Sequence, residues 1–494
     1  ISYMNITILP LKIALSFMLA MMLYSCARED VYMGDDIDIT TSRDTIMFDT
    51  VFTEVGSATR SFKLYNSKSK AVAVDIKLQG GATSFYRINA DGIVGPEINN
   101  ATIQANDSLY VFVEVFIDPD LPLSKSPFVV KDQVVITGGN DQDIVQLESF
   151  GQNANYVFGK RDITTIANIC NGTNPITWND PKPYVIYGIM AIIGCDLIIE
   201  AGTNVYVHGG IVIGDSLSYN PGRIFVKNGS IKANGTLENP ITIQGDRLEP
   251  EFADVPGQWF GIQLDSASIN NQFSYTTIKN GIYGILADSS SHLEIDHSQL
   301  LNSSSLGLFG SHSSAEVSNS LIYSAGSYGV YWRYGGNYNM NFSTVVSYGI
   351  QAEALRMENY LCTDQLCLGE IRTNPLMATI SNSILVGSSR DEILIDEFEG
   401  SDPFTVDYTF NNTMIRIDEF LESRPDFFDN CNDCINFNGT DALFVDVNDN
   451  NFELDSLSIA ERKSIPINGV TDDLLGRMRS SAPDMGCYES QFKM

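Results

Sequence analysis

Apolar residues recur every 22 or 23 positions between residues 273 and 350. Aligning the repeats gives three columns, each with one apolar residue per repeat. The columns are Phe273, Ile295, Val317 and Met340; Ile278, Leu300, Ile322 and Val345; and Ile285, Leu308, Val330 and Ile350. Short β-rich stretches carry the columns, and Ser, Asn and Gly turns separate them. Successive repeats should therefore stack as strands about 4.8 Å apart and share one interior, which predicts a parallel β-helix.

Residues 45–153 show a different pattern. Runs of strand length, such as 72–76, 109–117 and 134–136, alternate or stay apolar and are separated by turn residues. Seven or so short strands in about a hundred residues are typical of a β-sandwich. The order of the phrases at 61–66, 85–88 and 113–119 resembles the immunoglobulin-like modules of the choice-of-anchor and hydin-like type. The resemblance implies a spacer or packing module without chemistry of its own.

Three phrases after residue 153 stand out: Leu197 to Thr203, Gly229 to Thr236 and the closing run Pro483-Asp484-Met485-Gly486-Cys487-Tyr488-Glu489. They resemble the right-handed parallel β-helix repeats of Bacteroidota surface lipoproteins. Met485 and Cys487 depart from the usual closing phrase of that family. The resemblance implies an all-β chain with a right-handed parallel β-helix over 154–494 and a C-terminal cap over 440–494. The phrase at 380–385 restores the register of 317–322, so residues 351–378 are expected to form an inserted loop.

The N-terminus carries export signals. Lys12 precedes an apolar run from Ile13 to Leu23, which is too short to span a membrane comfortably and suits a signal peptide. The sequence Leu23-Tyr24-Ser25-Cys26 resembles a bacterial lipobox, which implies a lipoprotein signal peptide over 1–26 and lipidation of Cys26. Residues 27–44 are expected to be an acidic tether. These features predict a lipid anchor in the outer membrane and a cell-surface location; a secretory peptide without lipidation is the alternative.

The net charge and the cysteine content of the chain indicate which binding partners and which disulfide bonds to expect. The chain has 30 Lys and Arg residues against 61 Asp and Glu, a net charge of −31. A field of that sign repels nucleic acid and anionic membrane surfaces. Seven cysteines remain after Cys26, and an exported protein can pair them. Local pairing predicts Cys170 with Cys195, Cys362 with Cys367 and Cys431 with Cys434, which leaves Cys487 free.

Known catalytic and metal-binding patterns are missing from the sequence. The β-helix hydrolase motifs and the Arg-x-Pro-x-x-Arg lyase signature do not occur. No His or Cys spacing matches a zinc site, and His297 occupies the turn position of Asn319 and Asn382 in the repeat. Residues 446–450 begin like a calcium loop but lack its glycine and its final Glu. No cofactor is therefore expected, and the acidic run at 391–402 is only a weak calcium candidate.

Aromatic residues around Arg333 are the strongest binding candidate. If Val330 points inward, alternation sends Tyr331 and Arg333 outward and Trp332 inward. A sugar ring can stack on exposed Tyr and bond to Arg, so Tyr331, Arg333, Tyr334 and Tyr338 are predicted ligand-binding residues. The alternative is an aromatic ladder packed between coils and under the 351–378 loop.

The sequence thus favours a non-catalytic binding or adhesion protein with carbohydrate as its ligand. A polysaccharide lyase or glycoside hydrolase of the same fold, and a structural spacer or protein-binding adhesin, are the alternatives. A groove with several convergent acids and a Lys or Arg would favour the enzyme. A smooth polar surface and a blank glycan array would favour the spacer.

Overall fold

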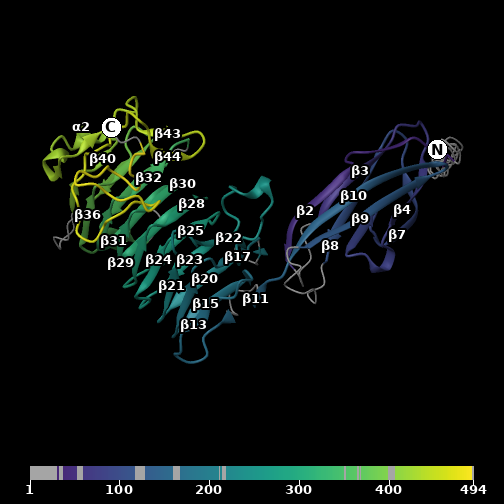
Figure 1. The fold of residues 1–494 in the computed structure, drawn as a ribbon, viewed down its shortest axis with the longest axis horizontal. Coiled ribbons are helices and arrows are strands. Elements are labelled where there is room, and N and C mark those ends of the chain that lie inside the picture. The colour runs from purple at the N-terminus through teal and green to yellow at the C-terminus, as the bar shows by residue number, and fades with distance from the viewer. Residues whose placement is uncertain are drawn as a thin grey trace, which may run out of the picture. The chain divides into compact units, whose positions relative to one another are not determined.

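The computed structural model describes residues 31–32, 37–52, 59–116, 128–159, 167–210, 212–213, 218–349, 352–363, 367, 369–398 and 406–491. The chain divides into two compact units, Ile1–Asn153 and Ala154–Met494. Regular structure in both is almost entirely β-strand, and the second unit contains long parallel sheets (Figure 1). The prediction of an all-β protein is confirmed. The predicted signal peptide, including Cys26, lies outside the described residues.

The first unit consists of two five-stranded sheets around one core. One sheet has the order β1 (Ile39–Thr41), β3 (Arg60–Asn66), β8 (Ser108–Val115), β5 (Tyr86–Ala90) and β6 (Ile93–Gly95). The other has the order β2 (Thr45–Phe52), β10 (Asp141–Gln152), β9 (Phe128–Gly138), β4 (Val72–Leu78) and β7 (Glu97–Ile103). Alternate residues of β3, β4 and β8 are buried together, as a half-buried strand requires.

The predicted tether over 27–44 is wrong for its last residues. Strand β1 pairs with β3, and the side chain of Ile37 is buried in the core of the first unit. Tyr32 also forms a bridge with Val72. Although this stretch is acidic, it contains two alternating isoleucines. Ile37 is buried in the core, and Ile39 packs against it.

In the second unit, the chain passes repeatedly between two long sheets. Every neighbouring pair in the eleven-stranded sheet is parallel. Its order is β11 (Asn155–Phe158), β14 (Tyr184–Tyr187), β17 (Asn204–His208), β22 (Ile241–Gly245), β25 (Thr276–Lys279), β28 (Gln299–Ser303), β30 (Leu321–Ala325), β32 (Thr344–Ser347), β37 (Ile384–Gly387), β40 (Met414–Ile415) and β42 (Ile435–Asn436).

The seventeen-stranded sheet is also built from parallel pairs. Its inward-facing residues share one core with those of the eleven-stranded sheet. Its strands are β12 (Ala167–Asn168), β13 (Ile176–Trp178), β15 (Ile189–Ile193), β16 (Asp196–Glu200), β20 (Arg223–Lys227), β21 (Ser230–Asn234), β23 (Gly261–Leu264), β24 (Asn271–Ser274), β26 (Tyr283–Ala287), β27 (His292–Asp296), β29 (Leu306–Ser318), β31 (Tyr328–Asn341), β33 (Glu353–Glu358), β36 (Leu376–Ser381), β38 (Ile393–Asp396), β39 (Val406–Asn411) and β41 (Cys431–Asn432).

The apolar columns coincide with the strand register. Ile278, Leu300, Ile322 and Val345 are successive partners, and so are Phe273, Ile295, Val317 and Met340. The third column continues from Val330 to Leu355. Ile350, predicted as its fourth member, lies outside the described residues. The partner of Val330 is Leu355 and not Ile350, because the chain adds residues before β33 begins.

A polar ladder accompanies the apolar columns at one corner of each repeat. His297, Asn319 and Asn382 all adopt positive φ, at 45°, 45° and 54°, so His297 occupies the predicted turn position. The next residue in each repeat carries a buried hydroxyl that accepts a hydrogen bond from the backbone of the preceding repeat, as Ser298 does from Thr276 at 3.1 Å. These hydroxyl residues are Ser298, Ser320, Ser343 and Ser383. The ladder satisfies backbone groups that the corner would otherwise leave buried and unpaired.

The inserted loop is shorter than the predicted 351–378. Residues 353–358 form β33, which pairs with β31 and β38 inside the long sheet. The insertion is instead an antiparallel hairpin of β34 (Tyr360–Cys362) and β35 (Ile371–Thr373). The disulfide Cys362–Cys367 lies in this hairpin. Cys170–Cys195 and Cys431–Cys434 are also joined, and Cys487 is a buried free thiol.

The C-terminal segment does not cap the end of the sheets, so the predicted role of 440–494 is wrong. Its strands β43 (Phe444–Asp446) and β44 (Asn451–Leu454) and the residues after them cover the outer face of the eleven-stranded sheet (Figure 1). They bury outward side chains of four successive strands: Leu321, Val346, Ile384 and Met414. The last layer of the main core is closed earlier, by Phe420 of α2 (Phe420–Ser423) and Phe427. The segment follows the flank because this stretch of the sheet has apolar residues on both faces.

Glu392, in the acidic run at 391–402, is buried. Ser347 Oγ, the Ala354 N–H at 3.0 Å and the Ser389 N–H at 2.8 Å donate to its carboxylate. Burial nevertheless raises the pKa of Glu392 to about 7. A carboxyl with a raised pKa stabilises the folded state at low pH and loses that contribution as the pH rises through the folded value.

We therefore expect Glu392→Gln to change the pH dependence of stability. The free energy of unfolding of the unmodified chain, relative to the variant, should fall by on the order of 3 kcal/mol as the pH rises through the window from 4.5, the ordinary value, to about 7. Urea unfolding followed by tryptophan fluorescence measures this, because Trp178, Trp259 and Trp332 all lie in the second unit. Glu294→Gln, at an exposed position, is the control. A difference that stays constant with pH would contradict the prediction.

Candidate functional site

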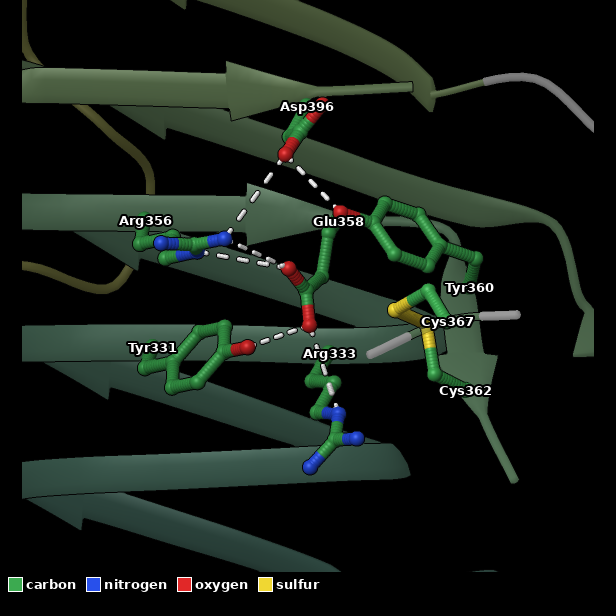
Figure 2. The surroundings of a disulfide bond; sticks show 8 residues. All are labelled: Tyr331, Arg333, Arg356, Glu358, Tyr360, Cys362, Cys367 and Asp396. Atoms are coloured by element: carbon green, nitrogen blue, oxygen red, sulfur yellow. Dashed lines mark hydrogen bonds and ion pairs between the residues drawn. A yellow bond between two sulfur atoms is a disulfide. The ribbon is translucent and has the colours of Figure 1, made fainter. Parts of the chain in front are cut away.

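Seven polar and aromatic side chains gather over the outer face of the long sheet, six of them from β31, β33 and β38 and one, Tyr360, from β34. We call this set the polar cluster: Tyr328, Tyr331, Arg333, Arg356, Glu358, Tyr360 and Asp396. Strand register brings it together, since Arg333, Glu358 and Asp396 are successive partners across the three strands. The intervening residues, such as Trp332 and Met357, point into the core. Figure 2 shows the cluster, except for Tyr328, beside the Cys362–Cys367 disulfide of the hairpin.

Glu358 lies at the centre of the polar cluster (Figure 2). The Tyr331 hydroxyl donates to its Oε1, and Arg333 Nε lies 3.3 Å from the same oxygen. Arg356 donates to Oε2 through Nη2 at 3.0 Å and Nε at 3.3 Å. The side chain of Glu358 is only 5% exposed, so the hydrogen bonds from Tyr331 and Arg356 and the charge of Arg333 replace water around the carboxylate.

Arg356 links the carboxylate to the surrounding tyrosines. Its Nη1 donates to the Tyr328 hydroxyl at 2.8 Å, and its guanidinium lies 5.4 Å from the ring centres of both Tyr328 and Tyr331. Burial alone would lower the pKa of Arg356, but the hydrogen bond with Tyr328 and the charge of Glu358 raise it above the ordinary value. The guanidinium is therefore a permanent charge at this site.

Two tyrosine hydroxyls of the cluster are held as donors. Burial, then the hydrogen bond to Glu358, raises the pKa of Tyr331 well above its ordinary value. Burial and the bond to Asp396, at 2.9 Å, raise the pKa of Tyr360 to about 12. Both side chains thus stay protonated at neutral pH and point their hydroxyls at carboxylates.

The structure separates the four predicted ligand-binding residues. Tyr331 and Arg333 point outward, and the Arg333 side chain is 32% exposed. Tyr334 is half-buried at the bend that follows, with positive φ and its ring 5.7 Å from that of His312. Tyr338 is fully buried, so it is unavailable to a ligand and that prediction is wrong.

Size complementarity explains the burial of Tyr338. Its partners in the neighbouring strands are Ala315 and Ala378, which leave room for a large ring in the interior. The ring stacks on Trp332 at 4.6 Å, and its hydroxyl donates to the Gly335 carbonyl at 3.1 Å. The aromatic ladder considered as the alternative therefore describes Trp332 and Tyr338 in the interior. It also describes Tyr331 on the outer face, whose ring lies 5.4 Å from that of its strand partner Phe309.

Sequence reasoning missed Arg356, Glu358, Tyr360 and Asp396. The first three lay in the stretch treated as a loop, and Asp396 lay in the acidic run. The alternation of Leu355, Arg356, Met357 and Glu358 was the available signal, because it matches that of Val330 to Arg333 on the strand before.

Other sequence candidates have structural explanations. The described residues contain no group of three His, Cys, Asp or Glu side chains arranged to hold a metal. Asp446 Oδ1 accepts the backbone N–H of Asn448 at 2.9 Å, as in a tight turn. Asp391 accepts the N–H groups of Asp418 and Phe420 at 2.6 and 3.1 Å. No helix in the part of the chain that the structure describes is long and apolar enough to cross a membrane.

Comparisons with known proteins find only partial similarity. No family model and no curated protein matches the chain. A protein of unknown function from Porphyromonas gingivalis W83 has 12% identity, covering 28% of this chain and 59% of its own, with a TM-score of 0.18. A family 123 glycoside hydrolase from Clostridium perfringens has 9% identity, covering 28% of this chain and 26% of its own, with a TM-score of 0.18.

The periplasmic chaperone SfaE has 8% identity, covering 37% of this chain and 84% of its own, with a TM-score of 0.16. The chain spans less than two thirds of the first two structures. At these TM-scores, none of the three carries an argument about fold or function.

Proposed function

We propose that this chain is a surface lipoprotein in which an immunoglobulin-like sandwich precedes a right-handed parallel β-helix, and that it binds carbohydrate without catalysis. The continuous in-register ladders of Ile278 and Phe273 support the helix, as do the parallel pairs throughout the second unit. The two sheets around one core support the sandwich. The lipobox at Cys26 supports the anchor in the outer membrane.

The observation that carries the binding function is the outward pair Tyr331 and Arg333, held in place by the buried Glu358. A surface that is ordered before binding loses little side-chain entropy when the ligand arrives. Tyr331 supplies an apolar ring face and Arg333 supplies fixed donors, which suit the apolar face and the hydroxyls of a sugar. The net charge of the four ionised side chains, two Arg against Glu358 and Asp396, is zero, so the site does not demand a charged glycan.

A glycan array probed with the full chain, purified in detergent, tests this proposal. We expect binding to at least one glycan class and its loss in the double variant Tyr331→Ala, Arg333→Ala. The matched control is Tyr110→Ala, Arg87→Ala, which removes the same residue types from the first unit. A blank array for the unmodified chain, or binding that survives in the Tyr331 and Arg333 variant, would overturn the proposal.

A glycoside hydrolase is the second candidate, because two carboxylates and two arginines converge in the polar cluster. Such enzymes act through a pair of carboxyl groups that flank the glycosidic bond. Glu358, however, is buried, accepts hydrogen bonds from Tyr331 and Arg356 and pairs with Arg333, so it has little room for a sugar. We expect no release of reducing ends from polysaccharides. Release that disappears in Glu358→Gln and Asp396→Asn would favour the enzyme instead.

A further inference from the structure

A row of aromatic rings crosses the first strands of the eleven-stranded sheet, whereas the polar cluster lies on strands of the seventeen-stranded sheet. Phe158 on β11, Tyr187 on β14 and His208 on β17 are successive partners in the parallel register. The ring centres of Phe158 and Tyr187 are 5.6 Å apart, and those of Tyr187 and His208 are 4.6 Å apart. Phe158 is 61% exposed. The row therefore offers one ring per strand on the outer surface.

The row ends at a cavity of about 770 Å³, within the range of small-ligand sites. His208, Asp246, Arg247, Phe252, Val255 and Pro256 are among its lining residues. The backbone of the wall is close-packed, since a Cβ at Gly209 would lie 1.6 Å from the Gln258 carbonyl oxygen. The cavity is thus held by main chain as well as by side chains.

His208 has a fixed orientation at the mouth of the cavity. Its Nδ1 lies 2.7 Å from Asp246 Oδ2, and a carboxylate can only accept, so Nδ1 carries the proton. In the neutral ring, Nε2 is then the acceptor. Arg247 is held by Glu249, with Nε 3.1 and 3.0 Å from the two carboxylate oxygens, and its guanidinium covers Phe252 at 3.7 Å.

Spacing and charge together select the ligand class. Neighbouring strands in a sheet are about 4.8 Å apart, close to the length of one hexose in a linear glycan. Because the rings stack on one another, a glycan laid across the strands would meet the edges of Tyr187 and His208 and the exposed ring of Phe158. Asp246 and Arg247 line the cavity, and Glu249 pairs with Arg247, so these three side chains leave one net negative charge there. An acidic sugar would be repelled by that charge and by the net charge of −31.

We propose that Phe158, Tyr187 and His208 bind a linear neutral oligosaccharide whose terminal sugar enters the cavity beside Asp246. This inference rests on the proposed function for the class of ligand, but it uses a site separate from the polar cluster. His208 Nε2 accepts a sugar hydroxyl, and Phe252 with Val255 and Pro256 supplies the apolar wall.

Isothermal titration calorimetry of the full chain in detergent, which measures its affinity for oligosaccharides, tests the site. The probes are cellohexaose, xylohexaose and mannohexaose as neutral hexamers, and hexagalacturonate as the acidic one. We expect at least one neutral hexamer to bind and hexagalacturonate not to bind. Phe158→Ala should weaken binding about tenfold, and His208→Ala should abolish measurable binding. Phe112→Ala, at another exposed aromatic position, is the control and should leave the affinity unchanged.

The variants separate this inference from the proposed function. Hexamer binding that persists in Phe158→Ala and His208→Ala but disappears in Tyr331→Ala, Arg333→Ala overturns the inference and leaves the proposed function standing. Binding lost only in the Phe158 and His208 variants supports the inference and removes the polar cluster as the binding surface. Preference for hexagalacturonate, or no hexamer binding at all, also overturns the inference. Near-ultraviolet circular dichroism of each variant verifies that the fold is intact.

Discussion

Replacing Arg479 with methionine is expected to destabilise the second unit by about 3–5 kcal/mol. Its side chain is only 2% exposed and lies 3.0 Å from Glu489. It also donates to Asn319 Oδ1 at 2.7 Å, and its guanidinium lies 3.9 Å from the ring centre of Phe342. The substitution leaves Glu489 buried without its counter-charge and detaches the C-terminal segment from the sheet that it covers.

The double variant Arg479→Met, Glu489→Gln is the matched control for this prediction. It removes both charges and keeps an acceptor for the Asp484 N–H, which donates to Glu489 Oε1 at 3.0 Å. We expect it to be more stable than the single variant. Urea unfolding followed by tryptophan fluorescence gives both values. A loss below about 1 kcal/mol in the single variant, the size of an exposed ion pair, would contradict the prediction.

Truncating Trp332 to alanine is expected to cost about 3–5 kcal/mol, as for other large buried aromatic residues. The side chain is fully buried, and its ring stacks on Tyr338 at an interplanar angle of 3°. Alanine would leave a cavity between the strands that carry the polar cluster. The same urea experiment measures the loss.

Trp332→Phe separates packing from hydrogen bonding. Trp332 Nε1 is buried and has no hydrogen-bond partner among the described residues, so losing this N–H removes an unsatisfied donor. We expect the Phe variant to lose much less stability than the Ala variant. Equal losses would show that ring stacking and volume are not what hold this residue in place.

The repeat region was predictable because its side chains meet their counterparts in the next strand. The column of Ile278, Leu300, Ile322 and Val345 could be aligned from spacing alone, and the strand register matches it. Repeat spacing does not predict the strand register where the length of the repeat changes. Leu355 replaced Ile350 as the partner of Val330 because the length of the connection before β33 cannot be inferred from the repeats on either side.

The candidate site was only partly predictable for the same reason. Alternation placed Tyr331 and Arg333 outward correctly. The positive φ of Tyr334, Gly335 and Gly336 then bends β31, and Tyr338 enters the interior between Ala315 and Ala378. Glu358 completes the site from a strand that begins 20 residues after Arg333, so only the folded register reveals the contact.

The contacts of the C-terminal segment with the outer face of the eleven-stranded sheet could not be predicted from the sequence for a different reason. Arg479 contacts Asn319 across 160 residues, and the Cys487 N–H donates to Thr344 Oγ1 across 143. The C-terminal segment has no repeat period, so its path over the sheet could not be aligned. The Asp484 and Glu489 carboxylates of the closing phrase accept backbone N–H groups within the segment, which explains these residues as structural.

Engineered disulfides between neighbouring strands test the stacked architecture most directly. Glu294 on β27 and Glu316 on β29 are exposed register partners, so their Cα atoms should lie about 4.8 Å apart, within disulfide range. Asn339 lies one strand further, about 10 Å from Glu294 and beyond that range. Peptide mass spectrometry after mild oxidation should find a cross-link in Glu294→Cys, Glu316→Cys and none in Glu294→Cys, Asn339→Cys. A cross-link in the second pair alone, or in neither, would contradict the stacking on which the account depends.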